Sequence, residues 1–139
     1  SELKKALALN LKMICANPDH VVMVGDKQHV CAGTYAQLYH DMGGDVSYHG
    51  KPHTPVYQAA QKALGIDDKQ KIVAVGDSLH TDIQGANSYD IHCVFNVDGI
   101  HFNEIACAHT EGGIDFSKLA SLVDTQPHKP TYALNGFAW

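Results

Sequence analysis

The feature of the sequence that most constrains its fold is a regular alternation of short apolar segments with longer amphipathic ones. Residues 72–75 are apolar and rich in β-branched side chains, as in a buried strand, whereas residues 32–42 carry apolar side chains at helical spacing. Because strands that alternate with helices of about ten residues build right-handed βαβ units, the sequence predicts an α/β fold with a parallel sheet. The expected strands are residues 13–16, 21–24, 46–49, 72–75, 91–95 and 131–134, and the expected helices are residues 2–10, 32–42, 54–64, 81–89, 102–109 and 115–123.

The composition excludes several classes of protein. Ten basic against fifteen acidic residues give a formal net charge of −5, whereas a nucleic-acid-binding surface needs clustered Lys and Arg. The longest apolar runs, such as residues 72–75, are far too short to span a membrane. No positively charged segment followed by an apolar one opens the chain, as a secretory signal would. We therefore expect a globular cytoplasmic protein whose partners are neither nucleic acids nor membranes.

A lysine-containing turn follows the strand predicted at residues 46–49. Gly50 permits an unusual backbone angle and Pro52 fixes the exit of the turn, so Lys51 is held at the edge of the sheet. In open α/β sheets the working residues lie beyond the carboxyl ends of the strands. A lysine in this place can bind phosphate as a point charge, although a Gly-Lys-Pro sequence is also an ordinary turn.

Two aspartates follow the strand predicted at residues 72–75. Asp77 comes directly after this strand and Gly76, and Asp82 lies five residues later, in the first turn of the next predicted helix. Two carboxylates at one strand end make the hard oxygen site that Mg²⁺ prefers. Helix capping by Thr81 or Asp82 and a turn role for Asp77 are the alternative interpretation. Asp98 to His101 follows the next strand and could help to close the same site, although an ordinary loop is the simpler interpretation.

The lysine turn and the acidic motif follow consecutive strands of the predicted sheet, so we expect Lys51, Asp77 and Asp82 to extend from neighbouring strand ends. This arrangement resembles the third and fourth motifs of the haloacid dehalogenase-like hydrolases. The resemblance is strongest to subfamily IIA, in which the lysine motif reads Gly-Lys-Pro, as in residues 50–52, and the acidic motif reads Gly-Asp-xxx-Thr-Asp-Ile, as in residues 76–83. Residues 14–19, Ile-Cys-Ala-Asn-Pro-Asp, are similar to the Thr-Asn-Pro-Asp segment that the same subfamily carries in its cap domain. The three motifs occur in the order of the family, and the resemblance covers nearly the whole chain.

The resemblance implies a Mg²⁺-dependent phosphatase that acts on a small phosphorylated metabolite through an aspartyl-phosphate. It also implies a Rossmann-like core over residues 48–139 and the C-terminal part of an α/β cap domain over residues 1–47. Carried over by position, Lys51 would stabilise the nucleophile and the transferring phosphoryl group. Asp77 would ligate the metal, and Asp82 would ligate it through water or orient its ligands. The residues expected to face the substrate are Asn17, Pro18, Asp19, Gly50 and Ser78.

The chain departs from the family in two respects: it lacks the Asp-x-Asp motif and the Ser/Thr motif that normally precedes the cap. No Asp-x-Asp followed by Gly occurs at a strand end, although this motif supplies the family's nucleophile and its general acid–base residue. We therefore expect a C-terminal portion of a phosphatase that is inactive alone. A sheet without its N-terminal strands would expose an apolar edge, which predicts a homo-oligomer or a domain swap through that edge. Phe137 and Trp139 are expected to pack on the sheet edge or in an interface.

Two other functions remain open from the sequence. Without the nucleophile, the chain could be a non-catalytic module that binds a metal or an anion, or that interacts with another protein. Residues 76–79, Gly-Asp-Ser-Leu, also spell the signature of GDSL esterases, in which Ser78 would be the nucleophile. That signature normally opens its domain, and here Asp124 and His128 are one residue further apart than the acid and base of that class.

Overall fold

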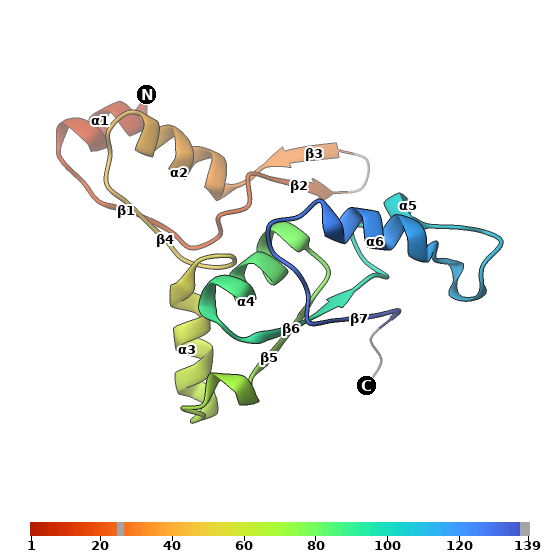
Figure 1. Ribbon diagram of the computed structural model, residues 1–139. Helices are drawn as coiled ribbons and strands as arrows, with labels where there is room; N and C mark the ends of the chain where they lie inside the picture. Colours follow the sequence, from red (N-terminus) through yellow and green to blue (C-terminus); the bar gives the residue numbers. More distant parts are fainter. Residues whose placement is uncertain (25–26, 137–139) are drawn as a thin grey trace. The chain divides into compact units, whose positions relative to one another are not determined.

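The computed structural model describes residues 1–24 and 27–136, which form two compact units, Ser1–Val56 and Tyr57–Trp139 (Figure 1). The division lies within a helix, later in the chain than the boundary expected after residue 47. The assignment of residues 1–47 to a cap and residues 48–139 to a core stays a prediction. Phe137 and Trp139, which were expected to pack on a sheet edge, lie outside the described residues.

The first unit contains two small sheets and two helices. Its strands β1 and β4 pair in parallel, with Met13 opposite Val46 and Cys15 opposite Tyr48. Strands β2 and β3 form an antiparallel pair. Tyr39 of helix α2 is buried, and its hydroxyl donates a hydrogen bond to the Leu11 carbonyl at 2.5 Å, so α2 is anchored to the segment that leads into β1. The elements in chain order are α1 (Glu2–Ala8), β1 (Met13–Cys15), β2 (Val21–Val24), β3 (Lys27–Val30), α2 (Ala32–Asp41) and β4 (Val46–Tyr48).

The second unit is built on a three-stranded parallel sheet in the order β5-β6-β7. Helix α3 (Thr54–Leu64) begins in the first unit and continues into the second, where all the remaining elements lie. The strands are β5 (Val73–Gly76), β6 (His92–Asn96) and β7 (Tyr132–Leu134). The helical segments are η1 (Lys69–Lys71), η2 (Leu79–Ile83), α4 (Gln84–Tyr89), α5 (Phe102–Ile105), η3 (Glu111–Gly113) and α6 (Phe116–Asp124). The predicted α/β fold with parallel sheets is confirmed.

One face of the three-stranded sheet carries the core of the second unit. Cys93 and Phe95 of β6 are fully buried, and they lie opposite Ala74 and Gly76 of β5. Side chains from α4, α5 and α6 pack on this face, where Figure 1 draws these helices on one side of the strands. The buried cluster comprises Tyr57, Leu79, Ile83, Ala86, Tyr89, Ile91, Cys93, Phe95, Val97, Ile105 and Ile114.

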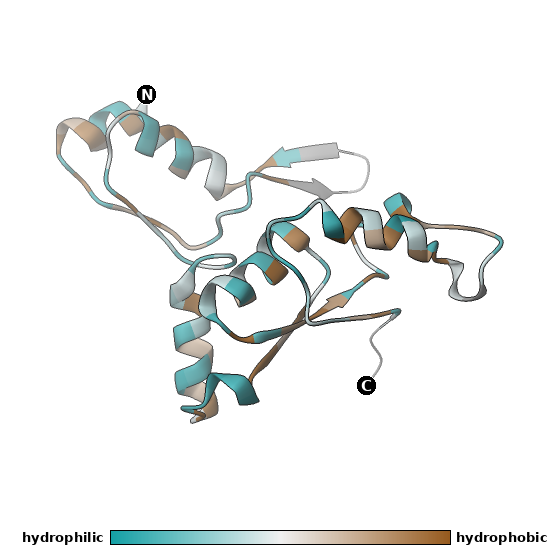
Figure 2. Ribbon diagram, viewed as in Figure 1, coloured by the Kyte–Doolittle hydropathy of each residue, from teal (hydrophilic) through white to brown (hydrophobic). Residues whose placement is uncertain are grey.

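The opposite face of this sheet is apolar but exposed. Val73 is 53%, Val75 42% and Tyr132 65% accessible to solvent. Val75, Val94 and Tyr132 are neighbours across the three strands, so their side chains share this face. Figure 2 draws β5 largely in the brown of apolar residues. Parallel sheets usually have both faces covered, so a second layer is missing from this side in the described part of the chain.

Three local predictions are corrected by the structure. Strand β4 pairs with β1 and not with β5, so the lysine turn and the acidic motif do not follow neighbouring strands of one sheet. The helix expected at residues 81–89 begins as the π-helical turn η2 and becomes regular only in α4. The helix expected at residues 102–109 ends at Ile105, because Ala106 bridges to Ile114 and the Cys107 N–H donates to the Gly113 carbonyl.

The exposed apolar face predicts that the isolated chain self-associates. Replacing both Val73 and Val75 by Thr keeps the β-branched shape but adds hydroxyl groups to the exposed face. We expect the double variant to sediment with a weaker dependence on concentration than the wild type, with little change in stability. Val30→Thr, at a 57% exposed strand position in the other unit, is the matched control. Equal sedimentation of all three proteins as monomers would contradict the prediction.

Candidate active site

Asp77 lies at the carboxyl end of β5 and is held by the loop that follows β6. Its Oδ2 accepts a hydrogen bond from the Ile100 N–H at 3.1 Å. Gly99 makes this approach possible, because a Cβ at this position would lie 2.3 Å from the Asp77 Cβ. The loop expected to be ordinary therefore supports the carboxylate directly. The sequence signal for this role was the place of residues 98–101 directly after the neighbouring strand.

Asp82 lies in the π-helical turn η2 and folds back onto the end of β5. It is only 5% exposed, and its Oδ2 accepts a hydrogen bond from the Ser78 N–H at 3.1 Å. A Cβ on Gly76 would lie 2.1 Å from the Asp82 Cγ, so a side chain at position 76 would push the carboxylate away. Burial of a carboxylate is costly unless donors surround it, and the amide at the start of this turn supplies one.

Ser78 separates the two aspartates and begins the helical turn. Its Oγ accepts a hydrogen bond from the Thr81 N–H at 3.2 Å, which makes Ser78 the N-cap of η2. The alternative interpretation of Thr81 or Asp82 as the helix cap is therefore wrong, because Ser78 caps the turn. A role for Ser78 in substrate binding stays a prediction.

Tyr57 of α3 supports the acidic turn from its other side. Its hydroxyl lies 3.4 Å from the Asp82 carbonyl oxygen, and Gly85 leaves the space that the ring fills. Burial, and then the nearby Asp82 charge, raise the pKa of Tyr57 to about 12. The hydroxyl therefore stays protonated and able to donate at neutral pH.

The Asn17–Asp19 segment and the lysine turn lie side by side in the first unit. Both follow strands of the β1–β4 pair at its carboxyl edge, since β1 ends at Cys15 and β4 at Tyr48. Gly50 has a φ of 93°, and a Cβ there would lie 2.9 Å from the Pro18 Cδ. The Asn17 Oδ1 accepts a hydrogen bond from the Asp19 N–H at 3.1 Å, which closes the tip of the segment. Lys51 follows Gly50 and is exposed.

The predicted site residues thus form two groups. Asn17, Pro18, Asp19, Gly50 and Lys51 lie together in the first unit, and Asp77, Ser78 and Asp82 lie together in the second. The expectation that Lys51 and Asp77 extend from neighbouring strands is wrong, because β4 hydrogen-bonds to β1. The sequence missed the contribution of Tyr57, because nothing in a helical Tyr indicates which turn it will meet.

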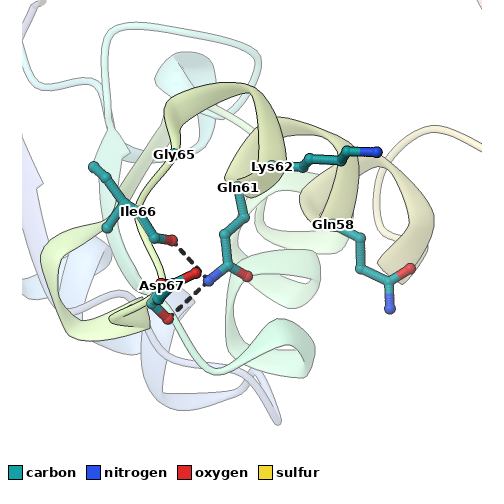
Figure 3. A pocket seen from close by; sticks show the side chains of 6 residues that line it. All are labelled: Gln58, Gln61, Lys62, Gly65, Ile66 and Asp67. Carbon is teal, nitrogen blue, oxygen red and sulfur yellow. Dashed lines mark hydrogen bonds between the residues drawn. The ribbon is translucent and has the colours of Figure 1, made fainter.

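A separate hollow of about 390 Å³ lies at the C-terminal end of α3 (Figure 3). The Gln61 amide donates hydrogen bonds to the Ile66 and Asp67 carbonyls at 2.9 and 3.0 Å, so it stabilises the loop after the helix. None of the predicted site residues lines this hollow, and we assign it no role in the site. Its lining residues are Gln58, Gln61, Lys62, Gly65, Ile66 and Asp67.

The donor set of the second group suits a hard cation. Mg²⁺ is usually bound through one or two carboxylates and completes its shell with water and substrate phosphate. Asp77 and Asp82 are two such carboxylates at one strand end. Among the described residues, no three His, Cys, Asp or Glu side chains gather closely enough to hold a metal. Asp77 and Asp82 therefore fit Mg²⁺ as part of a site that needs further oxygen ligands.

Comparison with known proteins places these residues in one family. The HAD-hydrolase-like family matches residues 48–116, the part of the chain with Lys51, Asp77 and Asp82. Comparison with curated proteins gives no match. Within the described residues, no helix is long and apolar enough to cross a membrane.

Solved structures match nearly the whole chain. A haloacid dehalogenase-like hydrolase from Brucella suis 1330 is 31% identical, with a TM-score of 0.68, over 99% of this chain and 48% of that one. A p-nitrophenyl phosphatase from Archaeoglobus fulgidus is 20% identical, with a TM-score of 0.73, over 95% of this chain and 46% of that one. A glycerol phosphate phosphatase from Mycobacterium tuberculosis, in complex with magnesium, is 22% identical, with a TM-score of 0.68, over 96% of this chain and 36% of that one. The chain thus spans about half of the first two structures and about a third of the last.

The close approach of Gly99 to Asp77 predicts a strong effect of a small substitution. In Gly99→Ala the new methyl group would overlap Asp77 and displace it or the loop, which we expect to cost about 1–3 kcal/mol of unfolding free energy. Urea denaturation measures this loss. The comparison is Gly65→Ala, where the added methyl group meets nothing within 4 Å and only the φ of 64° opposes it. Gly99→Ala should be the more destabilising variant, and a smaller loss than in Gly65→Ala would contradict the described contact.

The raised pKa of Tyr57 predicts a loss of stability in alkali. The folded state keeps the proton up to about pH 12, whereas the unfolded chain releases it near 10.0. The resulting stabilisation is fully present below pH 10 and disappears as the pH approaches 12. Two pH units correspond to roughly 2–3 kcal/mol. We expect the unfolding free energy of the wild type to fall more steeply than that of Tyr57→Phe over this range. If the unfolding free energies of the wild type and of Tyr57→Phe fell in parallel over this pH range, the raised pKa of Tyr57 would be contradicted.

Proposed function

This chain belongs to the haloacid dehalogenase-like hydrolases, and from that premise we propose that it supplies the electrostatic part of a Mg²⁺-dependent phosphatase site. The observation that carries the proposal is the pair Asp77 and Asp82 at the end of β5, with each carboxylate held by a backbone N–H. The family match covers both residues and Lys51. Membership of subfamily IIA, within this family, stays a prediction.

Each of the three charged residues has a separate task in this proposal. Asp77 would bind the metal directly, and Asp82 would bind it through water or orient the ligands of the metal. Lys51 contributes a point charge that offsets the negative phosphoryl group and the nucleophile. When bound, Mg²⁺ supplies the positive charge that phosphoryl transfer mainly requires.

The reacting carboxylate lies outside this chain in our proposal. In the complete site, an aspartate from another segment attacks the phosphorus of a phosphomonoester and the alcohol leaves. Water then hydrolyses the aspartyl-phosphate and releases inorganic phosphate. This chain alone would bind the cation but not turn over substrate.

The substrate of the complete protein is proposed to be a small phosphorylated metabolite. Two of the similar structures are a p-nitrophenyl phosphatase and a glycerol phosphate phosphatase, which supports this class of substrate. The residues expected to face the substrate stay Asn17, Pro18, Asp19, Gly50 and Ser78. A cytoplasmic location of the protein stays a prediction.

The two alternative functions have less support. A GDSL-type esterase needs a reactive Ser78, whereas its Oγ accepts the Thr81 N–H as a helix cap. Asp124, its candidate acid, has its Oδ1 3.9 Å from the Lys129 Nζ. A non-catalytic metal- or anion-binding module describes what the isolated chain would do if no nucleophile-bearing segment joins it.

Metal titration and reconstitution together test the proposed function. We expect calorimetry to show Mg²⁺ or Mn²⁺ binding to the chain, weakened roughly tenfold or more in Asp77→Asn and unchanged in Asp67→Asn, which alters an exposed carboxylate. p-Nitrophenyl phosphate should be hydrolysed with Mg²⁺ only when the chain is combined with the half of the Brucella suis hydrolase that it does not match. Lys51→Ala should then lower the rate.

Three results would count against this proposal. Equal metal affinity of the wild type and Asp77→Asn would contradict the proposed metal site at Asp77. Hydrolysis of p-nitrophenyl phosphate by the chain alone would show that it contains its own nucleophile. Covalent labelling of Ser78 by a fluorophosphonate would favour the esterase.

A further inference from the structure

His101 is a buried histidine whose two ring nitrogens both have partners. It is 8% exposed, and its ring packs edge-on against Phe95 with centroids 5.8 Å apart. Its Nδ1 lies 2.5 Å from the Glu104 Oε1, and its Nε2 lies 3.4 Å from the Leu79 backbone nitrogen. His101 lies at the end of the loop that supports Asp77. Burying a polar imidazole there costs free energy that an aliphatic side chain would not, unless its nitrogens are hydrogen-bonded.

The partners of His101 determine its tautomer. A backbone N–H can only donate, so Nε2 must be the unprotonated acceptor of the Leu79 N–H. The proton of a neutral ring is then on Nδ1, which donates to the Glu104 carboxylate. Glu104 thus orients the ring in the same way that carboxylates orient histidines in many functional sites.

Leu79 connects this histidine to the acidic turn. It is the first residue of η2, between Asp77 and Asp82 in the chain. Two other amides of the turn bind within it, since the Thr81 N–H donates to the Ser78 Oγ and the Ser78 N–H to the Asp82 carboxylate. Among the described contacts of this turn, the Leu79 N–H is the amide that binds the loop after β6. One loop therefore holds Asp77 through the Ile100 N–H and the Asp82 turn through His101.

We propose that His101, oriented by Glu104, is a positioning residue that holds Asp77 and Asp82 in their metal-binding arrangement. The inference rests on the proposed metal site but concerns residues outside its ligands. His101 contacts neither carboxylate in the described hydrogen bonds. It acts through the Leu79 backbone, so its loss should weaken metal binding without removing a ligand.

Three variants separate positioning from simple packing. His101→Leu fills the space but cannot accept the Leu79 N–H. His101→Gln keeps a polar atom near the place of Nε2, and Glu104→Gln keeps an acceptor for the Nδ1–H. His109→Leu, at an exposed position in the same region of the chain, is the control. All variants are made in the full chain, and thermal unfolding verifies that each is folded.

Mn²⁺ affinity and NMR are the two readouts. We expect His101→Leu to weaken Mn²⁺ binding 10–100-fold, His101→Gln to restore most of the loss, and His109→Leu to match the wild type. Nitrogen-15 spectra of the wild type should show a His101 ring protonated on Nδ1. Hydrogen exchange at the Leu79 amide should lose its protection in His101→Leu and regain it in His101→Gln.

The outcomes distinguish this inference from the function on which it rests. A wild type that binds no Mn²⁺ would reject the proposed metal site, while the ring tautomer and the Leu79 amide would still decide whether His101 holds the turn. Unchanged Mn²⁺ affinity in His101→Leu would overturn the positioning role. A ring protonated on Nε2 would do the same, because it could not accept the Leu79 N–H. If His101→Leu fails to fold, two other results decide whether His101 positions the turn. These are the Mn²⁺ affinity of His101→Gln relative to the wild type and the tautomer of the wild-type ring.

Discussion

The hydrogen bond from the Ser78 N–H to the Asp82 carboxylate is the contact on which the acidic site depends. It joins the end of β5 to the helical turn after it, so that a carboxylate buried to 5% exposure has a donor. Gly76 lets the carboxylate approach, and Tyr57 closes the other side of the turn. The same constraint explains why the helix begins as a π-helical turn. The first residues fold back onto the strand before regular helix continues from Gln84.

Parallel strand pairing brings separate motifs together in each unit. When two strands run in the same direction, the loops after them leave from the same edge. In the first unit this places Pro18 against Gly50, and in the second it places the Ile100 N–H on Asp77. In each pair the short loops touch because one of them has a Gly at the closest point, where a Cβ would lie under 3 Å from its neighbour.

The three-stranded sheet has the form of part of a larger α/β layer. One face is packed with buried side chains, whereas Val73, Val75 and Tyr132 leave the other face apolar and exposed. The chain also spans about half of the Brucella suis and Archaeoglobus structures that it matches. Both facts agree with a site whose reacting residue comes from elsewhere, as proposed for the missing nucleophile. An apolar face of this kind is a stronger drive for association than the strand edge alone, because it removes side-chain area from water as well as pairing backbone groups.

The sequence by itself determined most of the element order, the parallel α/β class and the chemical types at the site. Alternating β-branched and amphipathic segments require those elements, and Gly-Lys-Pro and Gly-Asp with a second Asp five residues later are local patterns. Strand β3 was missed, because its residues Lys27–Val30 are mostly polar and become a strand only by pairing with β2. Only the tertiary structure decided that β4 pairs with β1, that Gly99 and Ile100 support Asp77, and that His101 reaches Leu79. These are contacts between segments far apart in the chain, and local propensity carries no information about which partner a strand end or a buried ring will meet.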